Sequence, residues 1–296
     1  MAINPFHPRQ IMLQIGCALS ILISLAACAQ AVPSNQAPAL PTASPTLAIT
    51  YTITPSPQPT STATPTPPPT ETPLPNLQVC SPLESFTLED LPSIISNPYN
   101  PPRPGDDRPH HGVDFSFFRL GDRLSIQGLP VHAALAGTVA TVINDRFPYG
   151  NTLIIETPLD VIPPSWIDLI PIPTTAPTLA FIGPLTCPGL EPHPAWQTSE
   201  RSLFLLYSHL HSPPELQPGD RVECGQPIGE VGNTGNSINP HLHLEVRVGP
   251  RGARLGSMSH YDNSASETER YYYCVWRISQ LFQKIDPGNL LFSGLE

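Results

Sequence analysis

The sequence contains very little lysine: Lys284 is the only one among 296 residues. Lipoyl and biotin carrier domains attach their cofactor to a lysine at the tip of a hairpin, and Lys284 instead follows the last predicted helix. A carrier function is therefore excluded. Charged residues make up only 13% of the chain, and their formal net charge is −10. Because an acidic surface repels phosphate backbones, we expect no nucleic-acid partner.

The cysteines lack the Cys-x-x-Cys spacing that marks a metal knuckle. Four remain once the two in the first 28 residues are set aside: Cys80, Cys187, Cys224 and Cys274. An even number in an exported domain predicts two disulfides, for which three connectivities are possible. Cys187 and Cys274 both fall in predicted excursions from the core. The arrangement Cys187–Cys274 with Cys80–Cys224 is therefore preferred, and the other two stay possible.

Charge is nearly missing from the first 76 residues, where Arg9 and Glu71 are the only charged side chains. An apolar run from Ile11 to Ala27 ends in Leu25-Ala-Ala-Cys28, which resembles a bacterial lipoprotein signal. The run is at the lower limit for spanning a bilayer, so we predict that residues 1–28 form a cleaved signal peptide; an uncleaved anchor is the alternative. Lipid on Cys28 would hold the secreted protein on the outer face of the cytoplasmic membrane.

Residues 29–76 contain 13 prolines and 11 threonines and cannot bury a core. They predict a disordered, extended tether. Residues 77–296 are long enough for one sizeable domain. We place its core at about 100–250, a proline-rich insertion at 157–201 and a C-terminal extension at 250–296.

The pattern of this domain predicts a mainly β fold, an antiparallel sheet or sandwich with short peripheral helices. Strands are expected at 131–143, 151–156, 203–210 and 241–248. One short helix is expected to begin at Thr87. A second is expected over 271–282, after the capping box Ser266–Glu269 and closed by Asp286-Pro-Gly288.

Histidines and one aspartate carry the chemistry. His241 and His243 stand two apart in a strand-like segment, so their side chains share one face. His110 and Asp114 form a second nitrogen–oxygen pair, and His209 ends an apolar strand. Each of these three motifs, taken alone, more often has a structural role than a catalytic one. Together they provide three zinc ligands and two groups for proton transfer, because a zinc hydrolase leaves its fourth position to water.

Three ordered stretches, HHGVDFS (110–116), LLYSHL (205–210) and GQPIGEVGNTGNSINPHLHLEVR (225–247), resemble the lysostaphin/LytM family of zinc metallopeptidases. The resemblance implies a metallopeptidase domain with one zinc ion per chain, held by His110, Asp114 and His243. It implies that His209 and His241 are the catalytic histidines. It further implies hydrolysis of peptide bonds in bacterial peptidoglycan cross-links or stem peptides, in a groove of an antiparallel sheet. We expect a monomer.

A catalytically silent regulator of other cell-wall hydrolases is the alternative function. All five site positions are present, and a buried cluster of imidazoles without metal would be costly, which favours the enzyme. Neighbouring His111 and His211 are assigned structural roles. His132 and His193 receive no function.

Overall fold

The computed structural model describes residues 77–168, 187–189, 196 and 199–294. The predicted signal peptide, the tether and most of the insertion lie outside this part of the chain. No helix among the described residues is long and apolar enough to cross a membrane.

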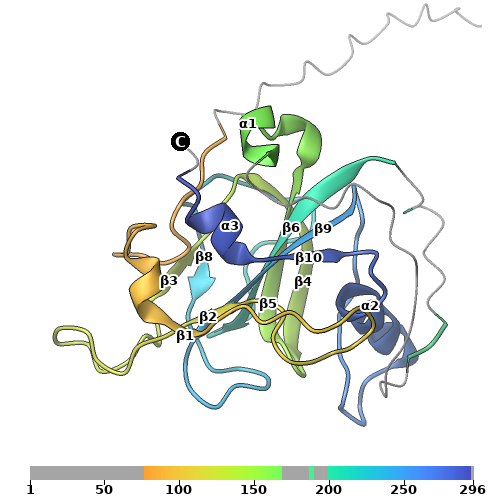
Figure 1. The fold of residues 1–296 in the computed structure, drawn as a ribbon. Coiled ribbons are helices and arrows are strands. Elements are labelled where there is room, and N and C mark those ends of the chain that lie inside the picture. The colour runs from red at the N-terminus through yellow and green to blue at the C-terminus, as the bar shows by residue number, and fades with distance from the viewer. Residues whose placement is uncertain (1–76, 169–186, 190–195, 197–198, 295–296) are drawn as a thin grey trace, which may run out of the picture. The chain divides into compact units, whose positions relative to one another are not determined.

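One antiparallel sheet dominates the fold (Figure 1) and confirms the predicted mainly β class. Its strands follow the order β1-β2-β9-β6-β5-β4-β7, and β10 also pairs with β9. Their bounds are β1 Ile95–Asn97, β2 Val113–Phe115, β4 Gly137–Arg146, β5 Gly150–Pro158, β6 Arg201–Leu210, β7 Arg221–Val222, β9 Leu242–Pro250 and β10 Gln283–Ile285. A separate pair joins β3 (Pro130–His132) to β8 (Pro227–Glu230).

The helices are short and peripheral, as predicted. They are η1 Leu91–Ile94, η2 Leu159–Val161, α1 Pro164–Ile167, α2 Glu267–Arg277 and α3 Pro287–Leu291. Both η elements are 3-10 helices. The longest, α2, begins with the predicted capping box: the Ser266 side chain accepts from the Glu269 backbone, and the Glu269 carboxylate accepts from the Ser266 backbone.

Two apolar clusters cover the two faces of the sheet. Leu242, Leu244, Val246 and Val248 of β9 all belong to the first cluster. Along β6 the side chains alternate between the two clusters: Leu203 and Leu205 belong to the first, and Phe204 and Leu206 belong to the second. That second cluster also contains residues of α2 and of the segment 253–282. Residues 253–282 of the C-terminal extension therefore pack on the sheet face opposite the first cluster, whereas Ile285, Leu290 and Leu291 belong to the first cluster.

The expected strand 131–143 is wrong as a single element. Residues 130–132 pair with β8, whereas residues 137–146 pair with β5 and β7 in the large sheet. Between them, Ala133, Ala134 and Leu135 are fully buried without belonging to a strand. The apolar run continues through the break because the linking residues are part of the core.

Both helix predictions need correction at their ends. Thr87 does not begin a helix: it donates to Asp90, and only the 3-10 helix η1 follows. The C-terminal helix ends at Arg277, so 283–285 are free to form β10. Asp286 starts α3, because its side chain accepts from Gly288 N, and does not close the preceding helix.

Two disulfides join the described cysteines, in the preferred connectivity. Cys80 pairs with Cys224, with their Cα atoms 5.7 Å apart, and Cys187 pairs with Cys274, with theirs 6.0 Å apart. Cys274 lies on α2, so the second disulfide attaches that helix to the insertion.

Candidate active site

The three candidate metal ligands come from two neighbouring strands and the segment before one of them. Asp114 on β2 lies directly opposite His243 on β9 in the antiparallel register. His110 stands four residues before Asp114, and its backbone exchanges two hydrogen bonds with Asn100. Because β2 is paired with β9, residues far apart in the sequence meet at one edge of the sheet.

The potential ligand atoms converge on one point. Asp114 Oδ1 lies 3.1 Å from His110 Nε2 and 2.7 Å from His243 Nδ1, and the two ring nitrogens are 3.1 Å apart. A tetrahedral zinc site with bonds of about 2.0–2.2 Å places its ligand atoms about 3.3–3.6 Å from one another, so small outward shifts of these side chains would admit the ion. The other carboxylate oxygen, Oδ2, accepts from Asn97 Nδ2 at 3.0 Å. The cluster thus fits three corners of a zinc site.

The hydrogen bonds of the outer ring nitrogens support this fit. His110 Nδ1 lies 2.9 Å from the carbonyl oxygen of Pro98, and His243 Nε2 lies 3.1 Å from Glu245 Oε1. An oxygen partner requires an N–H on that nitrogen, so a ring that gives up its other proton keeps its lone pair on the inner nitrogen. Both inner nitrogens face Asp114 Oδ1, and together with that oxygen they form the donor set of a cation site.

His209 and His241 complete the cluster. Their ring centroids are 4.6 Å apart, and His209 is 5.9 Å from the ring of His243. His209 Nδ1 lies 2.7 Å from the carbonyl oxygen of Thr234, and His241 Nδ1 lies 2.8 Å from that of Asn239. Each ring therefore has one N–H bound to the backbone, and its Nε2 stays available. The structure brings together all five residues predicted from the sequence.

The backbone of His209 adopts an uncommon conformation at the end of β6. Its φ angle is +61°, in the left-handed region that non-glycine residues seldom occupy. Its N–H donates to the carbonyl oxygen of Tyr149. This local turn of the strand sets the direction of the ring, and such outliers often occur at functional sites.

Burial and neighbouring charges set the protonation of these groups. Burial, with the nearby His241 and His243, lowers the pKa of His209 to about 3. Burial also lowers the pKa of His241. Burial alone would raise the pKa of Asp114, but hydrogen bonds with His110 and His243 outweigh it and hold that pKa well below its usual range. Burial disfavours the charged form of His243, but hydrogen bonds with Asp114 and Glu245 outweigh it and raise its pKa to about 9, so a bound cation must displace a proton from this ring. At neutral pH His209 and His241 are neutral beside the ionised Asp114.

The cluster opens into a cavity of about 700 Å³. Its lining includes the five site residues and, at the rim, two exposed apolar side chains, Phe118 (83% exposed) and Ile238 (92% exposed). A cavity of this size accepts an extended peptide segment or a comparable small ligand.

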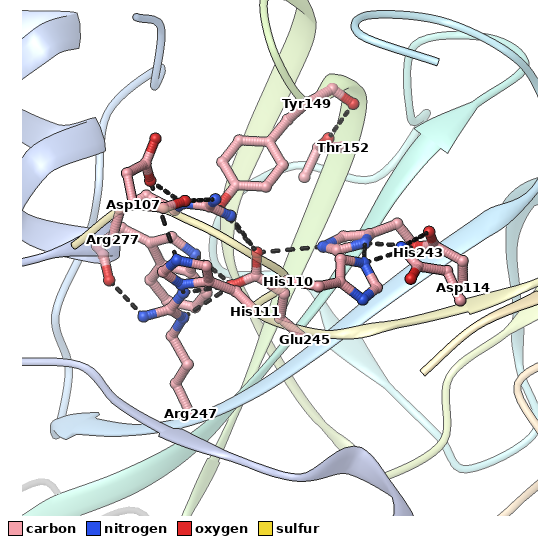
Figure 2. A network of polar contacts seen from close by, with 12 residues as sticks. Asp107, His110, His111, Asp114, Tyr149, Thr152, His243, Glu245, Arg247 and Arg277 are labelled. Atoms are coloured by element: carbon pink, nitrogen blue, oxygen red, sulfur yellow. Dashed lines mark hydrogen bonds and ion pairs between the residues drawn. The ribbon is translucent and has the colours of Figure 1, made fainter. Parts of the chain in front are cut away.

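Sequence reasoning missed a network of charged residues behind His243. Glu245 and Arg247 are fully buried on β9, and Arg277 of α2 reaches the same carboxylate (Figure 2). The sequence pattern could have predicted the place of Glu245 and Arg247, because positions 241, 243, 245 and 247 are all polar and alternate with apolar positions. A strand with this alternation places all four on one face.

Three other histidines singled out in the sequence lie among the described residues. His111 is buried and accepts a hydrogen bond from Arg247 at 2.7 Å, so its role is structural. His211 is exposed. His132 lies 3.7 Å from Glu84 on the surface. His193 lies outside the described residues.

Comparison with known proteins gives a family match over part of the chain. Residues 197–256 match the model of Peptidase family M23. This match confirms the resemblance seen in the motifs, and the matched segment contains His209, His241 and His243. An uncharacterized metalloprotease of Haemophilus influenzae is 29% identical over 161 residues, which are 53% of this chain and 23% of that relative. The chain thus spans less than a quarter of the relative's length.

Two solved structures are similar at low identity. The catalytic domain of the antimicrobial peptidase lysostaphin from Staphylococcus simulans is 22% identical, with a TM-score of 0.35, over 70% of this chain and 98% of that domain. A zinc-containing peptidase from Vibrio cholerae is 23% identical, with a TM-score of 0.30, over 54% of this chain and 34% of that protein. At these scores, neither structure adds weight to a functional assignment.

Proposed function

We propose that this chain, whose residues 197–256 match Peptidase family M23, is a zinc-dependent endopeptidase that hydrolyses peptide bonds in bacterial peptidoglycan. The observation that carries the proposal is the meeting of His110, Asp114 and His243, three donors within 4.8 Å of one another, beside two further neutral histidines. The family match supports the peptidase part of the proposal. The peptidoglycan substrate rests on the motif resemblance to lysostaphin/LytM-type enzymes.

His110 Nε2, Asp114 Oδ1 and His243 Nδ1 would hold the zinc ion. Zinc bound there supplies a Lewis acid that activates water and polarises the peptide carbonyl. The chain supplies the proton transfers. His209 and His241 are neutral at pH 7, so either ring can accept a proton at its free Nε2 and return it to the leaving amine. Backbone carbonyls fix the other nitrogen of each ring and so hold the orientation.

The test is digestion of purified peptidoglycan, with the released fragments identified by mass spectrometry. Wild-type protein containing zinc should release peptide fragments with a new amino terminus. Protein treated with a chelator should release none and should recover its activity when zinc is restored. Release of glycan fragments alone, or chelator-resistant cleavage, would contradict the proposal.

Zinc content separates the enzyme from the alternative regulatory function. A site that binds about one zinc ion per chain and cleaves peptidoglycan supports the enzyme. Protein that contains no zinc and activates a second hydrolase when mixed with it would support the regulator.

We also propose that the mature protein is anchored by lipid on Cys28, with residues 29–76 as the tether of the domain 77–296. The support is the Leu25-Ala-Ala-Cys28 pattern followed by proline- and threonine-rich sequence. Cys28→Ser should abolish lipid labelling and detergent partitioning. A Cys28→Ser protein that still begins at residue 1 and partitions unchanged would indicate an uncleaved anchor instead.

A further inference from the structure

Arg277 connects the two parts of the chain that provide the candidate metal ligands. It is the last residue of α2, in the C-terminal extension beyond the matched segment 197–256. Its Nη1 lies 3.1 Å from Glu245 Oε1, two residues after His243. Its Nε lies 2.6 Å from Asp107 Oδ1, three residues before His110. One guanidinium therefore contacts both ligand-bearing segments (Figure 2).

Glu245 links Arg277 to the candidate metal ligand His243. The same Oε1 atom that binds Arg277 lies 3.1 Å from His243 Nε2. The Glu245 side chain is fully buried, so bulk solvent does not compete for its oxygens. A carboxylate on the outer nitrogen of a metal-binding histidine fixes the tautomer and the ring orientation. Arg277 thus acts on His243 through Glu245.

Asp107 makes the second connection through the backbone. Arg277 Nη2 donates to the carbonyl oxygen of Asp107 at 3.0 Å, in addition to the bond from Nε to its carboxylate. This fork fixes both the side chain and the main chain of Asp107. The segment from 107 to His110 is therefore held at its start by Arg277 and at its end by the backbone bonds with Asn100.

We propose that Arg277 is a positioning residue for the metal site, which sets His243 through Glu245 and His110 through Asp107. The inference rests on the proposed zinc site. It assigns the C-terminal extension a part in the chemistry, beyond its packing against the sheet. The planar fork of arginine is essential to the role, because a lysine ammonium cannot make the paired contacts to Asp107 and still reach Glu245.

Glu245 keeps other partners when Arg277 is changed. Arg247 Nε lies 2.8 Å from Oε2, and Trp276 Nε1 donates to the same oxygen at 2.9 Å. Tyr149 also donates to Oε1 at 2.9 Å. Replacement of Arg277 therefore leaves both carboxylate oxygens paired but removes the charged contact from the oxygen that faces His243. This allows the positional effect to be measured in a folded protein.

The experiment measures zinc affinity by chelator competition and the absorption spectrum of the Co²⁺-substituted protein. Arg277→Met should weaken zinc binding about 10- to 100-fold, the usual effect of losing an outer contact of a metal ligand, and should alter the Co²⁺ bands. Arg277→Lys should recover only part of the affinity. Arg270→Met is the matched control on the same helix, because Arg270 contacts the carbonyl oxygen of Ala265 and neither carboxylate; its affinity and spectrum should match wild type.

The thermal unfolding of the metal-free variants separates position from stability. An Arg277→Met protein that unfolds at a lower temperature but has wild-type zinc affinity and Co²⁺ bands would overturn the inference and leave a structural role only. If that variant does not fold, Arg277→Lys decides by the same two measurements. Absence of zinc binding in the wild-type protein would refute the proposed function together with the inference. Zinc binding that is equal in wild type and variants would refute the inference alone.

Discussion

At the scale of single residues, the two groups of site histidines differ in their distance from Asp114. His243 Nδ1 lies 2.7 Å from Asp114 Oδ1, whereas His241 Nε2 lies 3.6 Å from it. We therefore expect His243→Ala to lose zinc and activity together. His241→Ala and His209→Ala should retain zinc and lose about 10²- to 10⁴-fold in cleavage rate, the range of an acid–base contribution.

Metal content by atomic absorption and fragment release by mass spectrometry check this prediction. His110→Ala and Asp114→Ala serve as further ligand variants and should behave like His243→Ala. Loss of zinc from His241→Ala with retention in His243→Ala would show that the two histidines have the opposite roles.

Lys284 on β10 gives a pH-dependent contribution to stability. Burial, together with the charge of Arg247, lowers its pKa from 10.5 to about 8. Between pH 8 and 10.5 the unfolded chain then binds more protons than the folded one, so raising the pH favours the folded state. The free energy of unfolding should rise over this window through the Lys284 contribution.

Denaturant titrations at pH 7 and pH 10 of wild type and Lys284→Met measure this effect. The variant should be more stable at pH 7, because it removes a cation that burial disfavours, and should show a smaller rise toward pH 10. Lys284→Arg is the control that keeps the charge at every pH. Its free energy of unfolding should neither increase at pH 7 nor rise toward pH 10 through this residue. An identical pH dependence in all three proteins would show that Lys284 has an ordinary pKa.

At the scale of elements, two glycines allow the close approach that positions His209. Gly235 has a φ of +71°, and a Cβ there would overlap the backbone of Gly150 and the carbonyl oxygen of Pro148. The preceding residue, Thr234, provides the carbonyl oxygen bound to His209 Nδ1. Gly235→Ala should therefore both destabilise the fold and move that carbonyl.

Gly252 provides a matched comparison, because its φ is +72° and a Cβ there would meet nothing within 4 Å. Gly252→Ala should cost about 1 kcal/mol for the left-handed backbone alone. Gly235→Ala should cost about 1–3 kcal/mol more from overpacking, and the folded variant should cleave more slowly. Equal unfolding temperatures and rates for the two variants would contradict this role of the Gly150–Gly235 contact.

The elements also show where sequence patterns succeed. The alternation of 241–248 predicted β9, which begins at Leu242, because side chains two residues apart in a strand point to the same face. The break between β3 and β4 was not predictable from the same rule, since the buried Ala133–Leu135 segment keeps the run apolar. Glu245 could have been suspected from its place in the alternation. Arg277 could not, because its contact with Glu245 joins residues 32 apart through a helix of the extension.

At the scale of the whole molecule, the two disulfides should have different effects on the site. Cys80–Cys224 closes a separation of 144 residues and Cys187–Cys274 one of 87. Removal of either should cost about 2–5 kcal/mol of stability. Only the second attaches α2, which carries Cys274 three residues before Arg277.

The double variants Cys187→Ala/Cys274→Ala and Cys80→Ala/Cys224→Ala compare these effects directly. The first should weaken zinc binding as well as lower the unfolding temperature, and the second should lower the unfolding temperature only. Zinc affinity that changes equally in both double variants would show that attachment of α2 has no special effect on the metal site.

The pairing of β2 with β9 also fixes when the site can exist during synthesis. Asp114 and His243 are 129 residues apart, and neither strand completes the ligand set without the other. At about 5–20 residues per second, a ribosome needs on the order of ten seconds to make the chain between them. Throughout that time the nascent chain carries His110 and Asp114 without their partner. The chain must therefore be synthesised past residue 243 before these three side chains can form the proposed zinc site.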